Sequence, residues 1–142
     1  MNRAKGKEIG LNTIEVVGTT IDTRHYIGGQ RVESVEAFTN TSPIDGSFLG
    51  DICRGTQKEA DLAVAAAKAA FPAWAALGPK GRGELLLRLA ELVEENIETL
   101  AQLETMDNGS LLRSHRRGVM PRVAMNIRFF ACLLYTSPSP RD

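Results

Sequence analysis

The sequence has little of several features that mark particular classes of protein. It holds only two cysteines, Cys53 and Cys132, which are too few for a disulfide framework in 142 residues. No apolar run approaches the roughly 20 residues that a membrane-spanning helix needs. The N-terminus carries basic side chains but lacks the apolar stretch of a secretory signal. These absences predict a cytoplasmic protein with no membrane partner.

An excess of charge of one sign is also missing. Lys and Arg together number 17, as do Asp and Glu, so the formal net charge is zero. This balance argues against a nucleic-acid partner. The basic run Arg113–Arg117 could contact phosphate, but no aromatic side chains are interleaved with it. A solvated helix face is therefore the favoured interpretation of this run, with a basic nucleic-acid-binding helix as the weaker one.

Groups that carry chemistry are scarce. The 13 glycines include no Gly-x-Gly-x-x-Gly or Walker-type loop, so no phosphate-binding loop is indicated. The two cysteines and two histidines lack the spacing of a zinc site. Cys53 falls on an expected strand far from either histidine in sequence, so we interpret it as structural and not as a nucleophile. From the residues alone we expect neither catalytic nor cofactor-binding groups in this chain.

The first third of the sequence has the period-two pattern and turn residues of short strands. Residues 1–25 are interpreted as a loose extension with a β-like patch at Thr13–Val17. His25–Val32 predicts a strand–turn–strand around Gly28-Gly29. Ala37–Asn40 and Ser47–Cys53 flank the turn sequence Ser-Pro-Ile-Asp-Gly. These segments predict antiparallel hairpins or a meander.

At Thr56 the apolar period changes to about 3.6 residues. Thr56 and Glu59 have the spacing of a capping box, in which the Thr hydroxyl accepts a backbone N–H and the Glu reaches back. We expect an alanine-rich helix up to Trp74, and a long helix from Pro79 to a C-cap at Asn108-Gly109. A third helix is expected over Leu111–Phe130, kinked or restarted at Pro121. The apolar faces of these three helices are larger than the surface that the short strands could cover. This indicates that the chain is part of a larger α/β unit.

Several stretches, in this order, resemble the opening of the aldehyde dehydrogenases. They are YIGGQRV, TSPIDGSFLGDI, EADLAVAAAKAAFPAWAAL and LLLRLAELVEENIETLAQLETMDNG. The later stretch VMPRVAMNIRFFA is similar to the hydroxymuconate-semialdehyde branch of that family. The resemblance covers residues 26–131, which it identifies as the N-terminal part of the NAD(P)-binding domain. Departures from the family pattern are Ser42, Gly81, Gly83 and Asn108.

The resemblance implies an α/β parent enzyme that oxidises an aldehyde to the carboxylic acid with NAD or NADP. It further implies a small-molecule semialdehyde substrate, a role in aromatic compound catabolism and a homo-oligomeric parent. The family's catalytic cysteine, glutamate and oxyanion donors match no residue of this chain. We therefore expect the 142-residue piece to bind no cofactor and to be inactive. The alternative is a self-contained helical module that binds another protein.

Two further expectations concern single sites. Some relatives hold a monovalent cation, and the matching positions here are Asn40, Thr41 and Asp107; hard oxygen ligands suit such an ion, although Asp107 could be purely structural. Residues Cys132–Asp142 look like a sequencing adapter translated in frame. The alternative for this tail is a natural Ser/Pro-rich extension.

Overall fold

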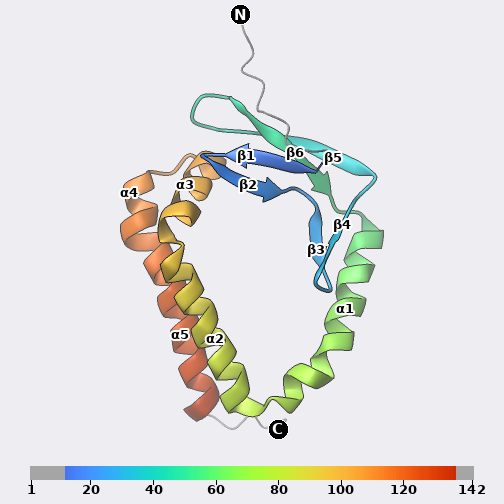
Figure 1. The fold of residues 1–142 in the computed structure, drawn as a ribbon, viewed down its shortest axis with the longest axis vertical. Coiled ribbons are helices and arrows are strands. Elements are labelled where there is room, and N and C mark those ends of the chain that lie inside the picture. Colours follow the sequence, from blue (N-terminus) through green and yellow to red (C-terminus); the bar gives the residue numbers. More distant parts are fainter. Residues whose placement is uncertain (1–11, 137–142) are drawn as a thin grey trace, which may run out of the picture. The chain divides into compact units, whose positions relative to one another are not determined.

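The computed structural model describes residues 12–136 and divides into two compact units (Figure 1). The first unit comprises the residues up to Ala70 together with Leu103–Gly109, and the second comprises Phe71–Gln102 and the residues from Ser110 onward. The elements are β1 (Thr13–Val16), β2 (Thr19–Asp22), β3 (His25–Ile27), β4 (Gln30–Val32), β5 (Glu36–Thr41), β6 (Phe48–Arg54), α1 (Gln57–Ala76), α2 (Gly78–Glu95), α3 (Ile97–Asn108), α4 (Leu112–Ser114), the π-helix η1 (His115–Val119) and α5 (Met120–Thr136).

Three antiparallel hairpins form the first unit's strands, in the pairs β1–β2, β3–β4 and β5–β6. The predicted β3–β4 hairpin is confirmed, with His25 opposite Val32. Its two turn residues, Gly28 and Gly29, have φ of 59° and 80°. Positive φ at both central residues is what the tight turn of such a hairpin requires, and glycine adopts it without steric cost. The β5–β6 hairpin is likewise formed where the sequence predicts it.

The segment before β3 is more ordered than the loose extension expected for residues 1–25. From Thr13 onward it forms the β1–β2 hairpin, with Ile14 opposite Ile21. Ile14 also packs on Gly50 of β6, where an added Cβ would lie 2.6 Å from the Ile14 Cγ2 atom. The Cys53 N–H donates to the Thr23 carbonyl over 3.2 Å. These long-range contacts fix the hairpin, and a local pattern could not show them; residues 1–11 lie outside the described part.

A capping box begins α1, as predicted. The backbone N–H of Thr56 donates to the Glu59 carboxylate over 2.9 Å. The Thr56 hydroxyl, expected to accept a backbone N–H, instead donates to the same carboxylate. These two hydrogen bonds, the side-chain one first, lower the pKa of Glu59, which is nearly fully buried. The Glu59 carboxylate therefore fixes the first turn of α1 by accepting both hydrogen bonds from Thr56.

The single long helix expected from Pro79 to Asn108 is wrong, because the chain breaks into α2 and α3 at Asn96. Asn96 has φ of −112° and ψ of 16°, and its side-chain amide donates to the Leu92 carbonyl over 2.8 Å. A side chain that bonds a carbonyl of its own turn competes with the helical backbone. The expected C-cap is confirmed, since Gly109 has φ of 76° and its N–H donates to the Thr105 carbonyl over 2.9 Å.

The third helical segment changes its hydrogen-bond pattern near Pro121, where a kink or a second segment was expected. The short α4 runs into the π-helix η1, and α5 begins at Met120 with Pro121 as its second residue. Met120 has helical φ and ψ and its N–H donates to the His115 carbonyl, so η1 runs into α5 without a free helix end. Proline has no N–H to donate to the preceding turn, and the π-turn stands directly before it. α5 continues to Thr136, beyond the expected end at Phe130. That Cys132–Asp142 is a foreign tail stays a prediction, because part of this segment is helical and residues 137–142 lie outside the described part.

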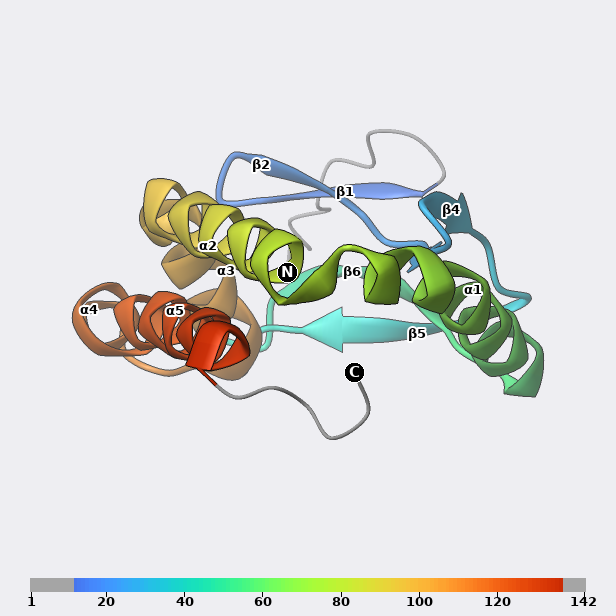
Figure 2. The same cartoon turned by 90° about the horizontal axis from the view of Figure 1, so that it is seen from below.

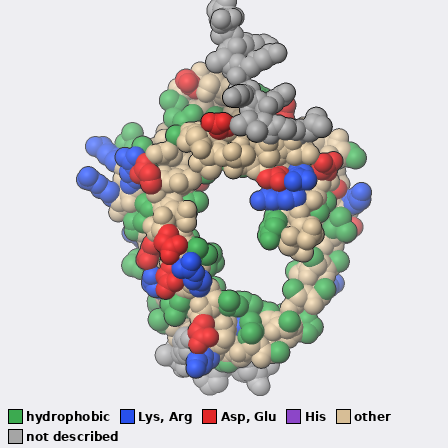
Figure 3. Space-filling model, in the orientation of Figure 1, with side chains coloured by type: hydrophobic (Ala, Val, Ile, Leu, Met, Phe, Trp, Pro, Cys, Tyr) green, Lys and Arg blue, Asp and Glu red, His purple; other side chains and the backbone are tan. Residues whose placement is uncertain are grey.

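The second unit is built on α2 and α5, which lie side by side in both views (Figure 1 and Figure 2). Ala90 of α2 and Ala124 and Ala131 of α5 have no exposed surface. Small side chains at a helix contact let the two backbones approach closely. Two ion pairs join the helical segments: Glu94 with Arg128 over 2.6 Å, and Glu98 with Arg116. Acidic and basic side chains adjoin each other over these helices in Figure 3.

Many large apolar side chains stay uncovered. The buried hydrophobic residues in the described part are six, four of them alanines: Val16, Ala90, Ala101, Met120, Ala124 and Ala131. By contrast Leu85 and Leu89 of the α2 stripe are about half exposed, and Phe71 of α1 is 65% exposed. The stripes therefore lack partners here, as the sequence predicts. In the described part, no single helix is both long and apolar enough to cross a membrane.

The two ion pairs that join different helices of the second unit, Glu94–Arg128 and Glu98–Arg116, predict how stability changes with pH. Hydrogen bonding to Arg128 lowers the pKa of Glu94, and hydrogen bonding to Arg116 and then to Gln102 lowers the pKa of Glu98. A carboxylate whose pKa is lower in the folded state stabilises the fold above its ordinary pKa, near 4.5 for glutamate. That contribution is lost as the pH falls through the lowered value. We expect the urea midpoint to decrease over this acidic range.

Urea unfolding followed by circular dichroism at a series of pH values tests this expectation. The variant Glu94→Gln/Glu98→Gln should have a smaller decrease in midpoint over the acidic range than the parent chain. The matched control is Glu15→Gln, because Glu15 is exposed and has no ion pair in the described part. An unchanged acid slope in the double variant would show that the ion pairs do not contribute.

Candidate functional site

The residues of the expected cation site lie at the end of β5 and in the last turn of α3, both in the first unit. A register shift between Asn40 and Thr41 places Thr41 opposite Phe48 and Asn40 opposite Gly50. Such an irregularity bends a strand and re-aims its side chains. The regular pairing of β5 with β6 therefore ends at Asn40 and Thr41.

The turn after β5 is held by its own hydrogen bonds. Ser42, which is 1% exposed, donates its N–H to Ser47 and accepts the N–H of Gly46 on its carbonyl, each over 2.8 Å. Its hydroxyl also accepts the Ile44 N–H over 3.3 Å. Ser42, a departure from the family pattern, therefore serves as a turn residue. Hydrogen bonds from Ser47 lower the pKa of Asp45, which closes the other side of the turn.

The C-terminus of α3 packs against this turn. A Cβ on Gly109 would lie 3.0 Å from the Cγ of Pro43, so the helix cap and the turn are in close contact. Across the same contact the Asn40 side-chain Nδ2 donates to the Asp107 Oδ1 over 2.7 Å. The structure thus brings together two residues that are 67 positions apart in the sequence.

This arrangement contains the oxygen donors that suit a hard cation, in the Asp107 carboxylate, the Asn40 amide oxygen and the Thr41 hydroxyl. Asn40, however, presents its amide nitrogen to the carboxylate, which satisfies Asp107 without an ion. A cation would have to replace that N–H by turning the amide. In residues 12–136, no three His, Cys, Asp or Glu side chains form a group that could hold a metal ion. Cation binding at these three residues stays a prediction.

Cys53 lies on β6, is half-buried and has a free thiol. Within the described part of the chain its thiol has no hydrogen bond to a histidine or carboxylate that could activate it. That Cys53 is structural and not a nucleophile stays a prediction.

Two features of the second unit were not foreseen from the sequence. The residues His115–Val119 form a π-helix, and the His115 side chain is only 4% exposed, with neither ring nitrogen hydrogen-bonded in the described part. Next to it a shallow groove is lined by residues of η1 and α5 together with Ser114. The only sequence signal was the basic run Arg113–Arg117, since a π-turn has no clear residue pattern.

Comparison with known proteins places this geometry in a family. The model of the aldehyde dehydrogenase family matches residues 30–138, so the chain belongs to that family. It is 38% identical over 107 residues to the 5-carboxymethyl-2-hydroxymuconate semialdehyde dehydrogenase of Escherichia coli, covering 75% of this chain and 23% of the relative. It is 39% identical over 109 residues to an acetaldehyde dehydrogenase of Pseudomonas aeruginosa, covering 75% and 22%. The chain thus spans less than a quarter of these curated relatives.

A solved structure agrees with the sequence relatives. PnpE in complex with nicotinamide adenine dinucleotide matches with a TM-score of 0.76 at 44% identity, over 78% of this chain and 23% of PnpE. PnpE is a protein of Pseudomonas sp. WBC-3. The predictions of an aldehyde dehydrogenase fold, and of a chain that corresponds to the N-terminal part of such an enzyme, are confirmed.

Proposed function

We propose that this chain supplies the N-terminal part of the cofactor-binding domain of an NAD(P)-dependent aldehyde dehydrogenase. The main support for this proposal is the match to the aldehyde dehydrogenase family over residues 30–138. The complex of PnpE with nicotinamide adenine dinucleotide supports this cofactor class for the whole enzyme. The same match favours an enzyme over a self-contained interaction module. In such an enzyme a cysteine thiolate attacks the aldehyde, hydride passes to the cofactor, and a glutamate activates the water that releases the acid.

The contribution of this chain to that chemistry is scaffolding. None of its residues matches the family's nucleophile, base or oxyanion donors. Its uncovered apolar stripes on α1 and α2 offer surface on which further layers of an α/β domain could pack. Each large apolar side chain that becomes buried there would stabilise the assembled domain by roughly 1.5–3 kcal/mol.

The 142-residue polypeptide is expected to bind neither NAD⁺ nor NADP⁺ and to oxidise no aldehyde. Loss of one oxyanion donor alone costs roughly 10²–10³ in rate, and here the nucleophile and base are missing as well. Calorimetric titration with both cofactors and absorbance assays of reduced cofactor test this. Micromolar cofactor binding, or turnover that Cys53→Ala abolishes, would contradict the proposal. The source DNA past the codon for Ala131 shows whether Cys132–Asp142 is native. The longer polypeptide that this DNA encodes is expected to be active.

We further propose that the substrate of the whole enzyme is a hydroxymuconate-type semialdehyde from aromatic ring cleavage. The Escherichia coli relative supports this, while the Pseudomonas aeruginosa relative, at similar identity, is named for acetaldehyde. The longer polypeptide should therefore have a higher kcat/KM for the semialdehyde than for acetaldehyde. A ratio below one would assign the enzyme to small aliphatic aldehydes and leave the family membership intact.

The cation site is tested by the salt dependence of stability. If Asn40, Thr41 and Asp107 hold Na⁺ or K⁺, one of these ions should raise the Tm relative to choline chloride at equal ionic strength. Asp107→Asn should remove that ion-specific increase, because it removes the only formal negative charge among the three residues. Asp61→Asn is the matched control, since Asp61 is an exposed helical carboxylate on α1. Equal Tm values in the three chlorides would show that Asp107 only pairs with Asn40.

A further inference from the structure

Asn108 is the only asparagine in the sequence that is followed by glycine. Glycine has no Cβ, so the backbone nitrogen of Gly109 is sterically open to the side chain before it. Attack of such a nitrogen on the side-chain carbonyl carbon is the reaction by which asparagine loses its amide, and it makes asparagine a thermolabile residue. Asn108 is also a departure from the family pattern, so the Asn-Gly pair belongs to this chain and not to that pattern.

The structure holds both reacting groups in the C-cap of α3. Asn108 is the last residue of that helix and is exposed. Its Nδ2 donates to the Glu104 Oε1 over 2.9 Å, so the side chain is directed back along the helix, away from the residue that follows. The Gly109 N–H donates to the Thr105 carbonyl over 2.9 Å. The nitrogen can therefore reach the side chain only when both hydrogen bonds open.

Contacts with the β5–β6 hairpin support this cap. A Cβ on Gly109 would lie 3.0 Å from the Cγ of Pro43, and the Asn40 Nδ2 donates to the Asp107 Oδ1 over 2.7 Å. All of these residues belong to the first unit. Opening of the cap is thus a local transition, and these contacts contribute to its free energy.

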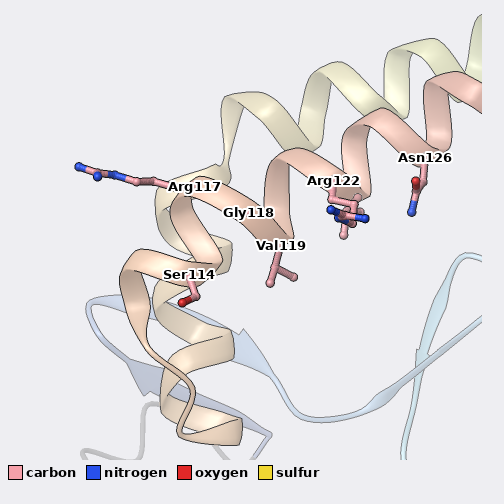
Figure 4. A pocket seen from close by; sticks show the side chains of 7 residues that line it. Ser114, Arg117, Gly118, Val119, Arg122 and Asn126 are labelled. Carbon is pink, nitrogen blue, oxygen red and sulfur yellow. The ribbon is translucent and has the colours of Figure 1, made fainter.

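Asn126 provides a contrast within the same chain. It is exposed, and its side chain projects from the middle of α5 in Figure 4. Ile127 follows it, so the neighbouring nitrogen is shielded by a β-branched side chain and lies within a helix. Exposure therefore does not distinguish Asn108 from Asn126, whereas the following glycine and the helix end do.

We propose that Asn108 is a modification site that deamidates when the C-cap of α3 opens, and that its deamidation then weakens the cap. In the open state the Gly109 nitrogen bonds to the Asn108 Cγ atom, and the side-chain nitrogen leaves as ammonia with the proton of that N–H. The resulting succinimide ring adds one water and opens to aspartate or isoaspartate. Water is the only other reactant, and nothing is oxidised or reduced.

The product has a carboxylate where the cap needs a hydrogen-bond donor. Glu104 loses the N–H that it accepts from residue 108 and meets a like charge four residues away, which destabilises a helix. Asp107 adds a further negative charge at the C-terminal end of α3, where the helix dipole favours positive charge. Isoaspartate also lengthens the backbone next to Gly109, which is in close contact with Pro43. Each of these changes favours the open cap.

Peptide mass spectrometry of the 142-residue chain, incubated with and without urea at mildly alkaline pH, measures conversion at each asparagine. In urea Asn108 should convert before the others, because glycine follows it alone. Without urea its conversion should be slower by roughly five- to hundredfold, since two hydrogen bonds must open first. Equal rates in the two conditions, or no conversion without urea after about a hundred of the half-lives seen in urea, would overturn control by the cap. A rate in urea no higher than that of the other asparagines would overturn the site itself.

Asn40→Ala tests whether the cap controls the reaction. It removes the hydrogen bond to Asp107, so conversion of Asn108 without urea should become roughly two- to tenfold faster, while the rate in urea stays the same. Asn12→Ala is the matched control, because it removes a side-chain hydrogen bond of the same length, to Glu33, that does not involve α3. Circular dichroism verifies that both variants are folded. Equal acceleration in both variants, or none in Asn40→Ala, would show that the cap contacts do not set the rate.

Asn108→Asp tests the effect of the product on the cap. Hydrogen exchange followed by NMR measures the protection of the Gly109 N–H, corrected for the intrinsic effect of the preceding residue. Protection should fall roughly two- to tenfold, because one hydrogen bond is lost and like charges adjoin. Asn108→Gln is the control, since it keeps a neutral amide, and its protection should equal that of the parent chain. Unchanged protection in Asn108→Asp, or an equal loss in Asn108→Gln, would refute the weakening of the cap by deamidation.

Discussion

Ala124→Leu is expected to lower the free energy of unfolding by about 1–3 kcal/mol. Ala124 of α5 has no exposed surface and lies where α5 packs along α2. Three additional carbon atoms at this contact must force the helices apart or displace side chains from their preferred rotamers. Separation of the helices would also lengthen the Glu94–Arg128 pair. Urea unfolding followed by circular dichroism measures the change.

The matched control is Met125→Leu on the same helix. Met125 is 59% exposed, so a swap of similar volume there should change the free energy of unfolding by no more than about 0.5 kcal/mol. Equal stability of Ala124→Leu and the parent chain would mean that α2 and α5 are not closely packed. That result would also remove the explanation for the row of alanines at this contact.

Gly50→Ala is expected to destabilise the first unit by about 1–3 kcal/mol. The new Cβ would lie 2.6 Å from Cγ2, 2.8 Å from Cδ1 and 3.3 Å from Cβ of Ile14. Cδ1 and Cγ2 could move only by rotation of the side chain, and χ1 of a β-branched residue has few allowed values. The Cβ atom of Ile14 is fixed to the backbone of β1, so the β1–β2 hairpin must also shift. Urea unfolding again measures the loss.

A double-mutant cycle with Ile14→Ala isolates this steric contact. The second substitution removes the clashing atoms, so the two changes together should cost less than their sum by about 0.5–3 kcal/mol. Gly118→Ala is the matched control, because nothing lies within 4 Å of its added Cβ and it is helical. This control should stabilise the chain by about 0.5–1 kcal/mol, since alanine favours a helix over glycine. Additive effects in the cycle would place Ile14 away from Gly50.

Elements that depend on neighbouring residues could be predicted from the sequence. The β3–β4 turn follows from two glycines, because only their backbones adopt positive φ freely at both positions. The start of α1 follows from Thr56 and Glu59, three residues apart. Gly109 ends α3 for the same local reason. The family also followed from the sequence, because its motifs occur in a fixed order along residues 26–131.

Other features depend on segments that are far apart in the sequence. The β1–β2 hairpin is held by Gly50 of β6, and Asn40 meets Asp107 only because α3 packs on the turn after β5. The break at Asn96 was missed because an apolar stripe can continue across a side chain that bonds back to its own turn. The resemblance to relatives, and not the spacing of residues, pointed to Asn40 and Asp107 as neighbours.

The sequence by itself determined the family, the β3–β4 and β5–β6 hairpins, the start of α1 and the end of α3, since capping and turn formation act within a few residues. Only the tertiary structure decided which alanines form the α2–α5 contact, which glutamates pair with Arg116 and Arg128, and which arginines stay unpaired. The physical reason is distance along the chain. The sequence around an arginine or an alanine does not show whether a distant segment will contact that side chain. Such contacts depend on how the whole chain packs, which results from many weak interactions together.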